Sequence, residues 1–240
     1  CICSVESFVQ CRVVSTMIEY TNNVNAKDKN GLTTLMYALS SKGCDDVVRL
    51  LLEKGAGVNI RDRNGMSPLM YAVNGLSSKS IVKLLIDKGA ELNAKDNDGK
   101  TVLQHSIDLC SAAIVKCLLQ AGARVDVPGY DGLTALAYTV QRCEENTDAI
   151  VKLLTKYKSN VNAIDRQNRT CLMLAIETTK GVPSNRMPRM FYVLRYIIKG
   201  ADVSLRDKDG QSAADIAMKC GLSSTLKDVI DLSTDNTNDN

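Results

Sequence analysis

Hydrophobic and polar positions follow a block pattern that recurs along the whole chain. Each block has a short apolar phrase, a polar turn and a second apolar run, such as residues 47–52 or 81–86. Apolar positions in these runs fall three and four residues apart, which is the spacing of one buried helical face. The sequence therefore predicts a pair of short helices in each block.

A second signal is a polar phrase that precedes the first helix of each block. Its clearest copies begin at Asp28, Asp62 and Asp96 and read Asp-x-x-Gly, one further residue, then Thr or Ser. The fourth copy has Gly129 in place of the Asp, and the fifth has Asn168 in place of the Gly. The equivalent turn positions 31, 65, 99, 132, 168 and 210 are 34, 34, 33, 36 and 42 residues apart. Such a period is typical of stacked repeats.

Each part of the block has a local structural reason. Gly31 and its equivalents permit the positive φ that closes a short finger. Thr33 and Ser67 stand where a helix N-cap is expected. Gly55 and Gly89 stand just past the end of the second helix. One finger-helix-turn-helix unit cannot bury its own apolar faces, so we expect neighbouring units to stack.

These blocks resemble the ankyrin repeat family. The stretch Ser67-Pro-Leu-Met-Tyr-Ala72 matches the family's T-P-L-H-x-A phrase best, and residues 55–59 match its Gly-Ala-x-Val-Asn ending. The resemblance implies an all-α repeat, an ankyrin-type α-solenoid of finger-helix-turn-helix units with short β-hairpin fingers. The family's His at the fourth place of the phrase is absent from every copy.

The repeats also define the expected domain organisation. We expect an ankyrin repeat domain over residues 1–232, with a partial repeat over 1–26 and repeats starting near 27, 61, 95, 128, 164 and 206. Residues 233–240 are polar and are expected to form a disordered tail or linker. Insertions near 144–147 and 179–189 lengthen repeats four and five. They are either tolerated surface loops or contact elements for a partner.

Finger tips and inner helices form the concave binding surface in this family, so the resemblance implies partner-binding positions here. The finger positions that differ between copies are rich in cations. The candidate binding residues on the fingers are Lys27, Lys29, Arg61, Arg63, Met66, Lys95, Lys100, Tyr130, Arg166 and Arg169. They form either a solvated charged edge or a row of cations for an acidic peptide or phosphates. The fourth finger interrupts this row, which disfavours continuous tracking of a nucleic-acid backbone.

A second set of candidate binding residues lies at the penultimate place of the phrase. Tyr37, Tyr71, His105 and Tyr138 stand there in four consecutive repeats. Tyrosine is a favoured interface anchor because it contributes a large area with few torsions. The rings either cover the inner helices or form a ladder that grips a peptide, and the ladder is our hypothesis.

Composition fits packed helices and gives little support to catalysis. Hydrophobic residues make up 45% of the chain and aromatic residues only 4%, which favours helices over a sandwich or barrel. With His105 as the single histidine, we expect no catalytic site, metal or cofactor. The Asp-x-x-Gly turns resemble fragments of a calcium loop but lack its downstream Glu.

Cysteine usage and charge bear on the compartment and the partner. The chain has nine scattered cysteines without a C-x-x-C pair, so we expect free thiols and a cytoplasmic, reducing compartment. No run approaches the ~20 apolar residues of a membrane span. The net charge of +3 does not by itself indicate a particular class of partner. The chain starts at Cys1, so targeting segments upstream could be missing.

The sequence therefore predicts a non-catalytic protein–protein interaction module, part of a scaffold or adaptor. Its partner is expected to be a protein or peptide, with an acidic one favoured by the finger cations. One alternative is binding of an anionic ligand such as RNA or an oligonucleotide. Another is that this segment recruits or regulates for a larger enzyme, or for a microbial or viral effector. The oligomeric state and the partner's identity stay open.

Overall fold

The fold is a series of short helices joined by hairpin-like fingers. The computed structural model describes residues 23–41, 43–75, 77–142, 146–178, 194 and 197–221. The helices of these residues are α2 (Thr34–Ser40), α3 (Asp45–Glu53), α4 (Pro68–Asn74), α5 (Lys79–Asp87), α6 (Val102–Asp108), α7 (Ala112–Gln120), α8 (Ala135–Arg142), α9 (Thr147–Lys156), α10 (Cys171–Thr178) and α12 (Ala213–Lys219). The β-structure described consists of isolated antiparallel bridges within fingers.

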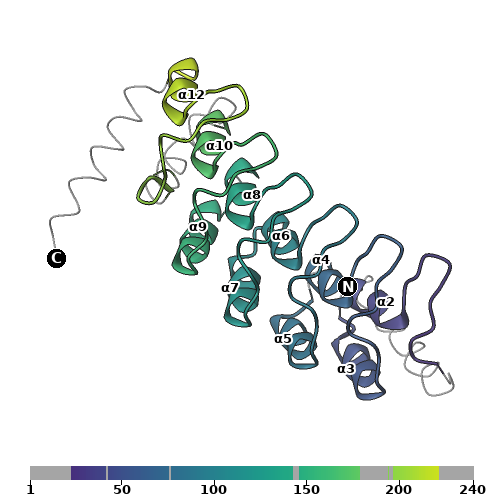
Figure 1. Ribbon diagram of the computed structural model, residues 1–240. Coiled ribbons are helices and arrows are strands. Elements are labelled where there is room, and N and C mark those ends of the chain that lie inside the picture. The colour runs from purple at the N-terminus through teal and green to yellow at the C-terminus, as the bar shows by residue number, and fades with distance from the viewer. Residues whose placement is uncertain are drawn as a thin grey trace, which may run out of the picture. The chain divides into compact units, whose positions relative to one another are not determined.

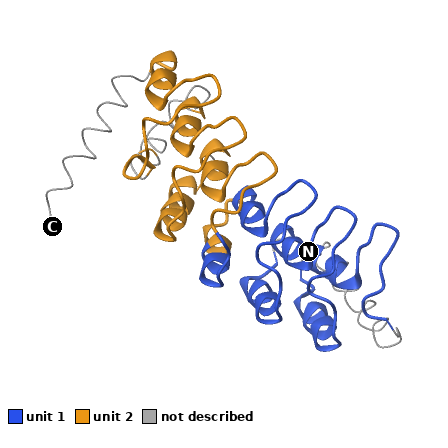
Figure 2. Cartoon of the chain, in the orientation of Figure 1, with its two compact units in different colours: residues 1–109, 116–124 blue, residues 110–115, 125–240 orange. Residues whose placement is uncertain are grey.

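Contacts divide the chain into two compact units (Figure 2). The N-terminal unit contains residues 1–109 and 116–124, and the C-terminal unit contains residues 110–115 and 125–240. Each unit is described by itself below.

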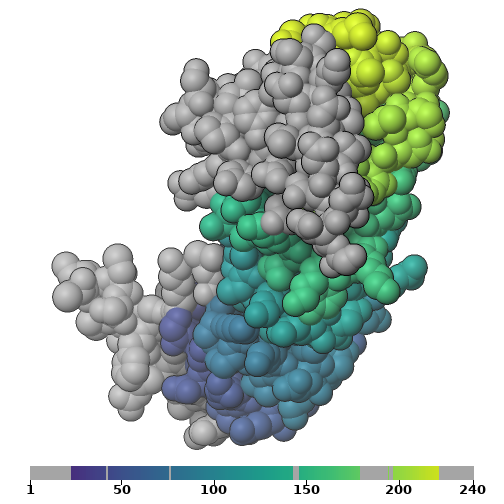
Figure 3. Space-filling view, turned by 90° about the vertical axis from the view of Figure 1, so that its left-hand side faces the viewer, coloured from purple at the N-terminus to yellow at the C-terminus, as the bar shows by residue number. Residues whose placement is uncertain are grey.

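In the N-terminal unit the helices form two rows (Figure 1). Helices α2, α4 and α6 form the inner row, in which α4 packs against both neighbours, and α3 and α5 lie in the outer row. The fingers extend from the inner row on the side away from α3 and α5 (Figure 1). Figure 3, which views the side that faces left in Figure 1, shows the described purple and blue residues as closely packed atoms.

The inner helices are buried on nearly all sides, which explains their apolar phrases. Leu35, Met36 and Leu39 of α2 are fully buried, and so are Leu69 and Met70 of α4. The outer helices are amphipathic, and α3 and α5 bury one face each. Burial of about ten such side chains at roughly 1.5–3 kcal/mol each makes stacking the main source of stability.

The C-terminal unit repeats this arrangement. Helix α10 packs between α8 and α12, and α9 packs against α8. Leu136 of α8 and Ile150 of α9 are among the largest fully buried side chains. Leu172 and Ile176 of α10 are also buried, so the aliphatic core predicted from the composition is present in this unit.

Backbone hydrogen bonds connect the fingers of neighbouring repeats within each unit. In the N-terminal unit the N–H of Arg63 donates to the carbonyl of Asn30 at 3.0 Å. In the C-terminal unit the N–H of Arg166 donates to the carbonyl of Asp131 at 3.2 Å, and the N–H of Lys208 to Gln167 at 2.9 Å. Finger position is therefore set by the preceding finger as well as by the turn itself.

The predicted local signals are confirmed. Gly31 and Asn168 have φ of 82° and 58°, so the turn positions adopt the left-handed conformation in both residue types. Thr33 and Ser67 accept hydrogen bonds from the N3 backbone of α2 and α4. Gly55 follows the end of α3 with φ of 82°. The all-α repeat fold class is therefore correct.

Some sequence predictions lie outside the described residues. These are the partial repeat before residue 23, residues 144–145 of the first insertion, the whole insertion over 179–189, and residues 222–232 of the last repeat together with the tail over 233–240. The expected single domain over 1–232 stays a prediction. Among the cysteines, Cys117, Cys171 and Cys220 are free thiols as expected. Cys44 is disulfide-bonded, so the expectation of thiols is wrong at this position.

Candidate binding surface on the fingers and inner helices

Each finger of the N-terminal unit is closed by the aspartate that begins its phrase. Asp28 Oδ1 accepts hydrogen bonds from the backbone N–H groups of Asn30 and Leu32, both at 2.8 Å. Asp62 Oδ1 binds the equivalent N–H groups of its own finger at 2.9 and 2.8 Å. A carboxylate that accepts two backbone N–H groups fixes the turn, which is why Asp recurs at this place.

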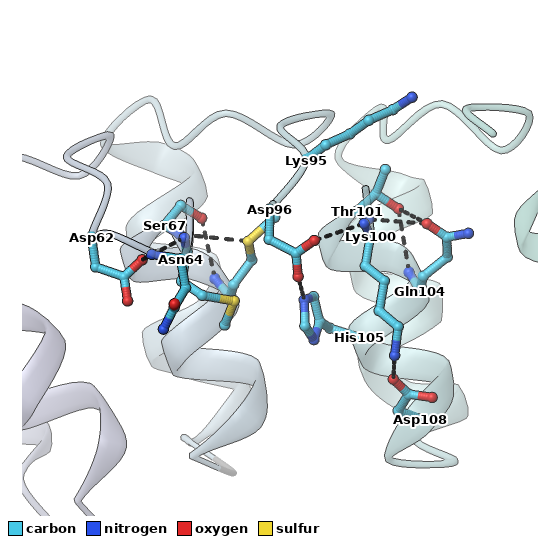
Figure 4. A network of polar contacts seen from close by, with 12 residues as sticks. Asp62, Asn64, Ser67, Lys95, Asp96, Lys100, Thr101, Gln104, His105 and Asp108 are labelled. Carbon is cyan, nitrogen blue, oxygen red and sulfur yellow. Dashed lines mark hydrogen bonds and ion pairs between the residues drawn. The ribbon is translucent and has the colours of Figure 1, made fainter. Parts of the chain in front are cut away.

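The second carboxylate oxygen of these aspartates binds the ring nine residues later. Tyr37 Oη donates to Asp28 Oδ2 at 2.8 Å, and Tyr71 Oη donates to Asp62 Oδ2 at 2.8 Å. His105 Nε2 lies 2.8 Å from Asp96 Oδ2, as Figure 4 shows. These rings therefore connect each finger to the helix that follows it.

Sequence reasoning missed this contact, although the pattern contained a signal for it. An Asp followed nine residues later by Tyr or His occurs in three successive repeats. The fourth repeat has Gly129 where the Asp would stand, although Tyr138 is kept. Because Gly129 has no carboxylate, Tyr138 lacks the contact that Tyr37 and Tyr71 make with the residue nine positions earlier.

Electrostatics at these contacts favour the neutral form of Tyr37 and Tyr71 and the charged form of Asp28. Burial and the hydrogen bond to Asp62 raise the pKa of Tyr71 to about 12. The hydrogen bond to Asp28 raises the pKa of Tyr37. Partial desolvation pushes the pKa of Asp28 upward, but the hydrogen bonds from Tyr37 and the finger backbone outweigh it and lower this pKa overall. The phenol is thus the donor and the carboxylate the acceptor.

Exposure differs strongly among the four predicted ladder residues. In the N-terminal unit the Tyr37 ring is 51% exposed, Tyr71 is half-buried, and His105 is only 9% exposed. In the C-terminal unit Tyr138 is 7% exposed, and the Arg142 guanidinium lies 5.5 Å from the centre of its ring. The area that a partner could contact is therefore concentrated at Tyr37 and Tyr71.

Several of the predicted finger cations make internal contacts. Lys27 Nζ donates to the carbonyl of Arg61 at 3.0 Å, and the Arg61 guanidinium donates to the carbonyl of Lys95 at 2.6 Å. Lys100 Nζ forms an ion pair with Asp108 at 3.0 Å (Figure 4). Because these side chains hold neighbouring backbone or acidic groups, only part of the predicted cation row is available to a ligand.

The cations that are available in the N-terminal unit are Lys29, Arg63 and Lys95. All three are exposed, and among the residues that the structure describes their charged groups have no hydrogen bond or ion pair. Figure 4 shows Lys95 extending away from the network around Asp96. Met66 is half-buried, and its N–H donates to the carboxylate of its own finger.

Of the three predicted finger residues in the C-terminal unit, Arg169 makes internal ion pairs, whereas Arg166 and Tyr130 contact each other. The Arg169 guanidinium contacts Asp165 at 2.8 Å and Glu177 at 3.1 Å, so it stabilises its own repeat. The Arg166 guanidinium lies over the ring of Tyr130, 4.4 Å from its centre. The Tyr130 ring is 66% exposed and is thus accessible to a partner.

Metal binding and membrane insertion have little support among the described residues. Within the described ranges, no three His, Cys, Asp or Glu residues come together as a metal site. Asp28 and Asp62 use their oxygens for backbone N–H groups of the finger and for a tyrosine O–H of the helix that follows. No helix of the part that the structure describes is long and apolar enough to cross a membrane.

Comparisons with known proteins agree with this geometry. A family model described as ankyrin repeats (3 copies) matches residues 54–129, and one described as ankyrin repeats (many copies) matches residues 17–72. Ankyrin repeats are general protein–protein interaction modules and are generally non-catalytic. A search of curated proteins gives no significant match.

Two solved structures show the similarity at the level of the fold. A chain from the complex of the Bd0816 predatory endopeptidase of Bdellovibrio bacteriovorus with the immunity protein Bd3460 is 30% identical, with a TM-score of 0.63. That match covers 85% of this chain and 98% of the other. The ankyrin repeat domain of Bcl-3, a member of the IkappaB protein family, is 22% identical, with a TM-score of 0.75 and coverage of 94% and 95%. From its repeats, its finger geometry and these matches, the chain belongs to the ankyrin repeat family.

Proposed function

We propose that this chain is a non-catalytic module that binds a segment of a partner protein along its fingers and inner helices. One observation carries the proposal. The exposed Tyr37 ring is held in place by Asp28, next to the unpaired cation Lys29 and one finger away from Arg63. This combination of a fixed aromatic ring and available cations suits a protein partner with acidic groups.

Fixing the ring in advance favours binding. A free tyrosine loses torsional freedom when a partner immobilises it, and this loss opposes association. The hydrogen bond between Tyr37 and Asp28 restricts the ring before the partner arrives. The same bond leaves the ring face available, because the contact uses only the hydroxyl group.

A similar structure supports a role in protein assembly. The chain that is 30% identical comes from a complex of an endopeptidase with an immunity protein. From this similarity we take only the class of partner, which is a protein. We further propose that the module is part of a scaffold or adaptor.

Unpaired cations at Lys29, Arg63 and Lys95 favour a second candidate, a polyanion such as RNA. The two candidates differ in their response to salt. A nucleic acid that contacts several phosphates loses affinity steeply as salt rises, whereas an interface centred on Tyr37 changes little.

The test is selection of peptides from a random display library on the full chain. Selected peptides should bind Tyr37→Ala and Arg63→Glu variants more weakly, by about tenfold or more for Tyr37→Ala. Lys83→Glu on the outer helix α5 is the matched control, because Lys83 is exposed and lies on the row away from the fingers. Failure to select any peptide, or equal binding to all variants, contradicts the proposal.

A cytoplasmic location is a further part of the proposal. The thiols of Cys117 and Cys171 agree with a reducing compartment, whereas the disulfide at Cys44 does not. Alkylation of the protein directly on extraction from its host, followed by mass analysis, decides this. A fully alkylated chain supports the cytoplasm, and an oxidised Cys44 contradicts it.

A further inference from the structure

A stacked pair of side chains stands at the tips of two adjacent fingers in the C-terminal unit. The Arg166 guanidinium lies 4.4 Å from the centre of the Tyr130 ring. The backbones of the two fingers are joined, since the N–H of Arg166 donates to the carbonyl of Asp131. The position of the guanidinium is therefore supported by the Tyr130 ring and by the finger that carries Arg166.

Stacking leaves the hydrogen-bonding edge of this arginine unused. The guanidinium carbon lies over the face of the Tyr130 ring, and a guanidinium carries its five N–H donors in its own plane. Among the described residues the Arg166 side chain has no hydrogen bond or ion pair. Arg169, by contrast, has its donors occupied by Asp165 and Glu177. A stacked guanidinium with open donors fits a carboxylate in two parallel hydrogen bonds.

The residues around Tyr130 and Arg166 favour a partner segment that carries apolar side chains beside one acidic side chain. Ile164, two residues before Arg166, is 51% exposed, and the Tyr130 ring is 66% exposed. Exposed acidic residues, Asp131 and Asp209, occupy the turns of the neighbouring fingers. These carboxylates repel a continuous polyanion, whereas a single carboxylate flanked by apolar side chains avoids them.

We propose that Tyr130 and Arg166 form a receptor for one Asp or Glu side chain of a partner protein, with a neighbouring apolar residue of that partner against Ile164. This inference rests on the proposed function and names the chemistry of the partner segment. The exposed Lys208, at the equivalent place of the next finger, adds positive charge beside this receptor.

The experiment compares two synthetic peptide pools on the full chain. Peptides of the first pool carry one Asp or Glu among apolar and small residues, and the second pool has Asn or Gln at the same place. Wild type should retain the acidic pool preferentially. Arg166→Ala should weaken binding of retained peptides by about tenfold or more, and Arg166→Lys should also weaken it because the planar fork is lost.

Matched variants separate the receptor from general charge and from folding. Tyr130→Ala removes the ring beside the guanidinium and should bind more weakly. Lys156→Ala removes an exposed cation of α9 and should have no effect. Thermal unfolding of each variant checks that the repeats stay folded.

Three outcomes overturn the inference. They are equal retention of the two pools, acid preference that Arg166→Ala does not change, and retention of neither pool. If peptides selected from the random library bind equally well without Arg166, the inference about this receptor is wrong, whereas the proposed function still stands. Salt-sensitive binding of a single-stranded RNA that requires Arg166 assigns the site to nucleic acid instead.

Discussion

The hydrogen bond from Tyr71 to Asp62 gives the sharpest test of how the fingers are held. Tyr71→Phe removes only the hydroxyl group, and the ring keeps its place on α4. The lost bond, 2.8 Å long, joins a phenol to a buried carboxylate that also accepts two backbone N–H groups. We expect Tyr71→Phe to destabilise the N-terminal unit.

The magnitude follows from the pKa of Tyr71. Its rise from 10.0 to about 12 would correspond in full to roughly 2.7 kcal/mol. The ring is only partly buried, so solvent screening reduces this to about 1 kcal/mol, the usual contribution of one hydrogen bond. A loss of about 1 kcal/mol lowers Tm by roughly 2–4 °C in a chain of this size.

The pH dependence has a definite direction. Because the pKa of Tyr71 is higher in the folded chain than in the unfolded chain, the stabilisation is fully present below pH 10. It is lost as the pH rises through about 12, where the phenol ionises next to Asp62. Wild type and Tyr71→Phe should therefore differ in stability at pH 7 and converge near pH 12.

The assay is urea unfolding followed by circular dichroism for wild type, Tyr71→Phe, Asp62→Ala and the double variant. Asp62→Ala should be the more damaging single change, because it leaves two finger N–H groups without their acceptor. The coupling energy between the two positions should be about 1 kcal/mol. Tyr37→Phe, which removes the same bond at a more exposed ring, should cost less. A coupling energy near zero refutes the reasoning.

The remaining predictions concern a turn, a bridge between repeats and a buried thiol. Gly65→Ala should destabilise the chain by about 1 kcal/mol more than Gly89→Ala in urea unfolding. Both glycines have positive φ, but a Cβ on Gly65 would lie 2.9 Å from the backbone nitrogen of Asn97, whereas the space around Gly89 is open. Asn59→Ala should lower stability by about 1 kcal/mol in the same assay, because Asn59 bonds two backbone groups of the next repeat at 2.8 and 2.9 Å. Burial raises the pKa of Cys171, so its thiol should react with a disulfide reagent only at the rate of unfolding, as mass analysis of timed samples would show.

Much of the candidate site could be predicted from the sequence because the family phrase marks its register. The phrase located the finger tips, and the structure places Lys29, Arg63 and Tyr130 at exposed positions of those fingers. The repeat pattern could not show which of these cations already pair with other groups of the chain. Lys100 and Arg169 both stand at the same place in their fingers, yet each pairs with an acidic residue eight positions later, on the following helix.

The predicted ladder residues also differ in exposure, although they share one place in the phrase. Tyr37 and Tyr138 occupy equivalent places in the phrase, but one is 51% exposed and the other 7%. The aspartate contact does not by itself set this exposure, because His105 binds Asp96 as Tyr37 binds Asp28 and is only 9% exposed. Exposure therefore depends on the packing around each ring, which its place in the phrase does not give.

The helices, the caps, the turns and the repeat can be predicted from the residues alone, because each depends on residues within a few positions of one another. Turn residues with positive φ (Gly, or Asn168 in the fifth copy), N-cap hydroxyls and apolar spacing act locally and recur in the copies. Which side chains remain accessible to a partner depends on how the repeats pack in three dimensions. That choice depends on contacts between one finger and the next, such as Arg61 with Lys95 or Arg166 with Tyr130, which are about one full repeat apart in the chain.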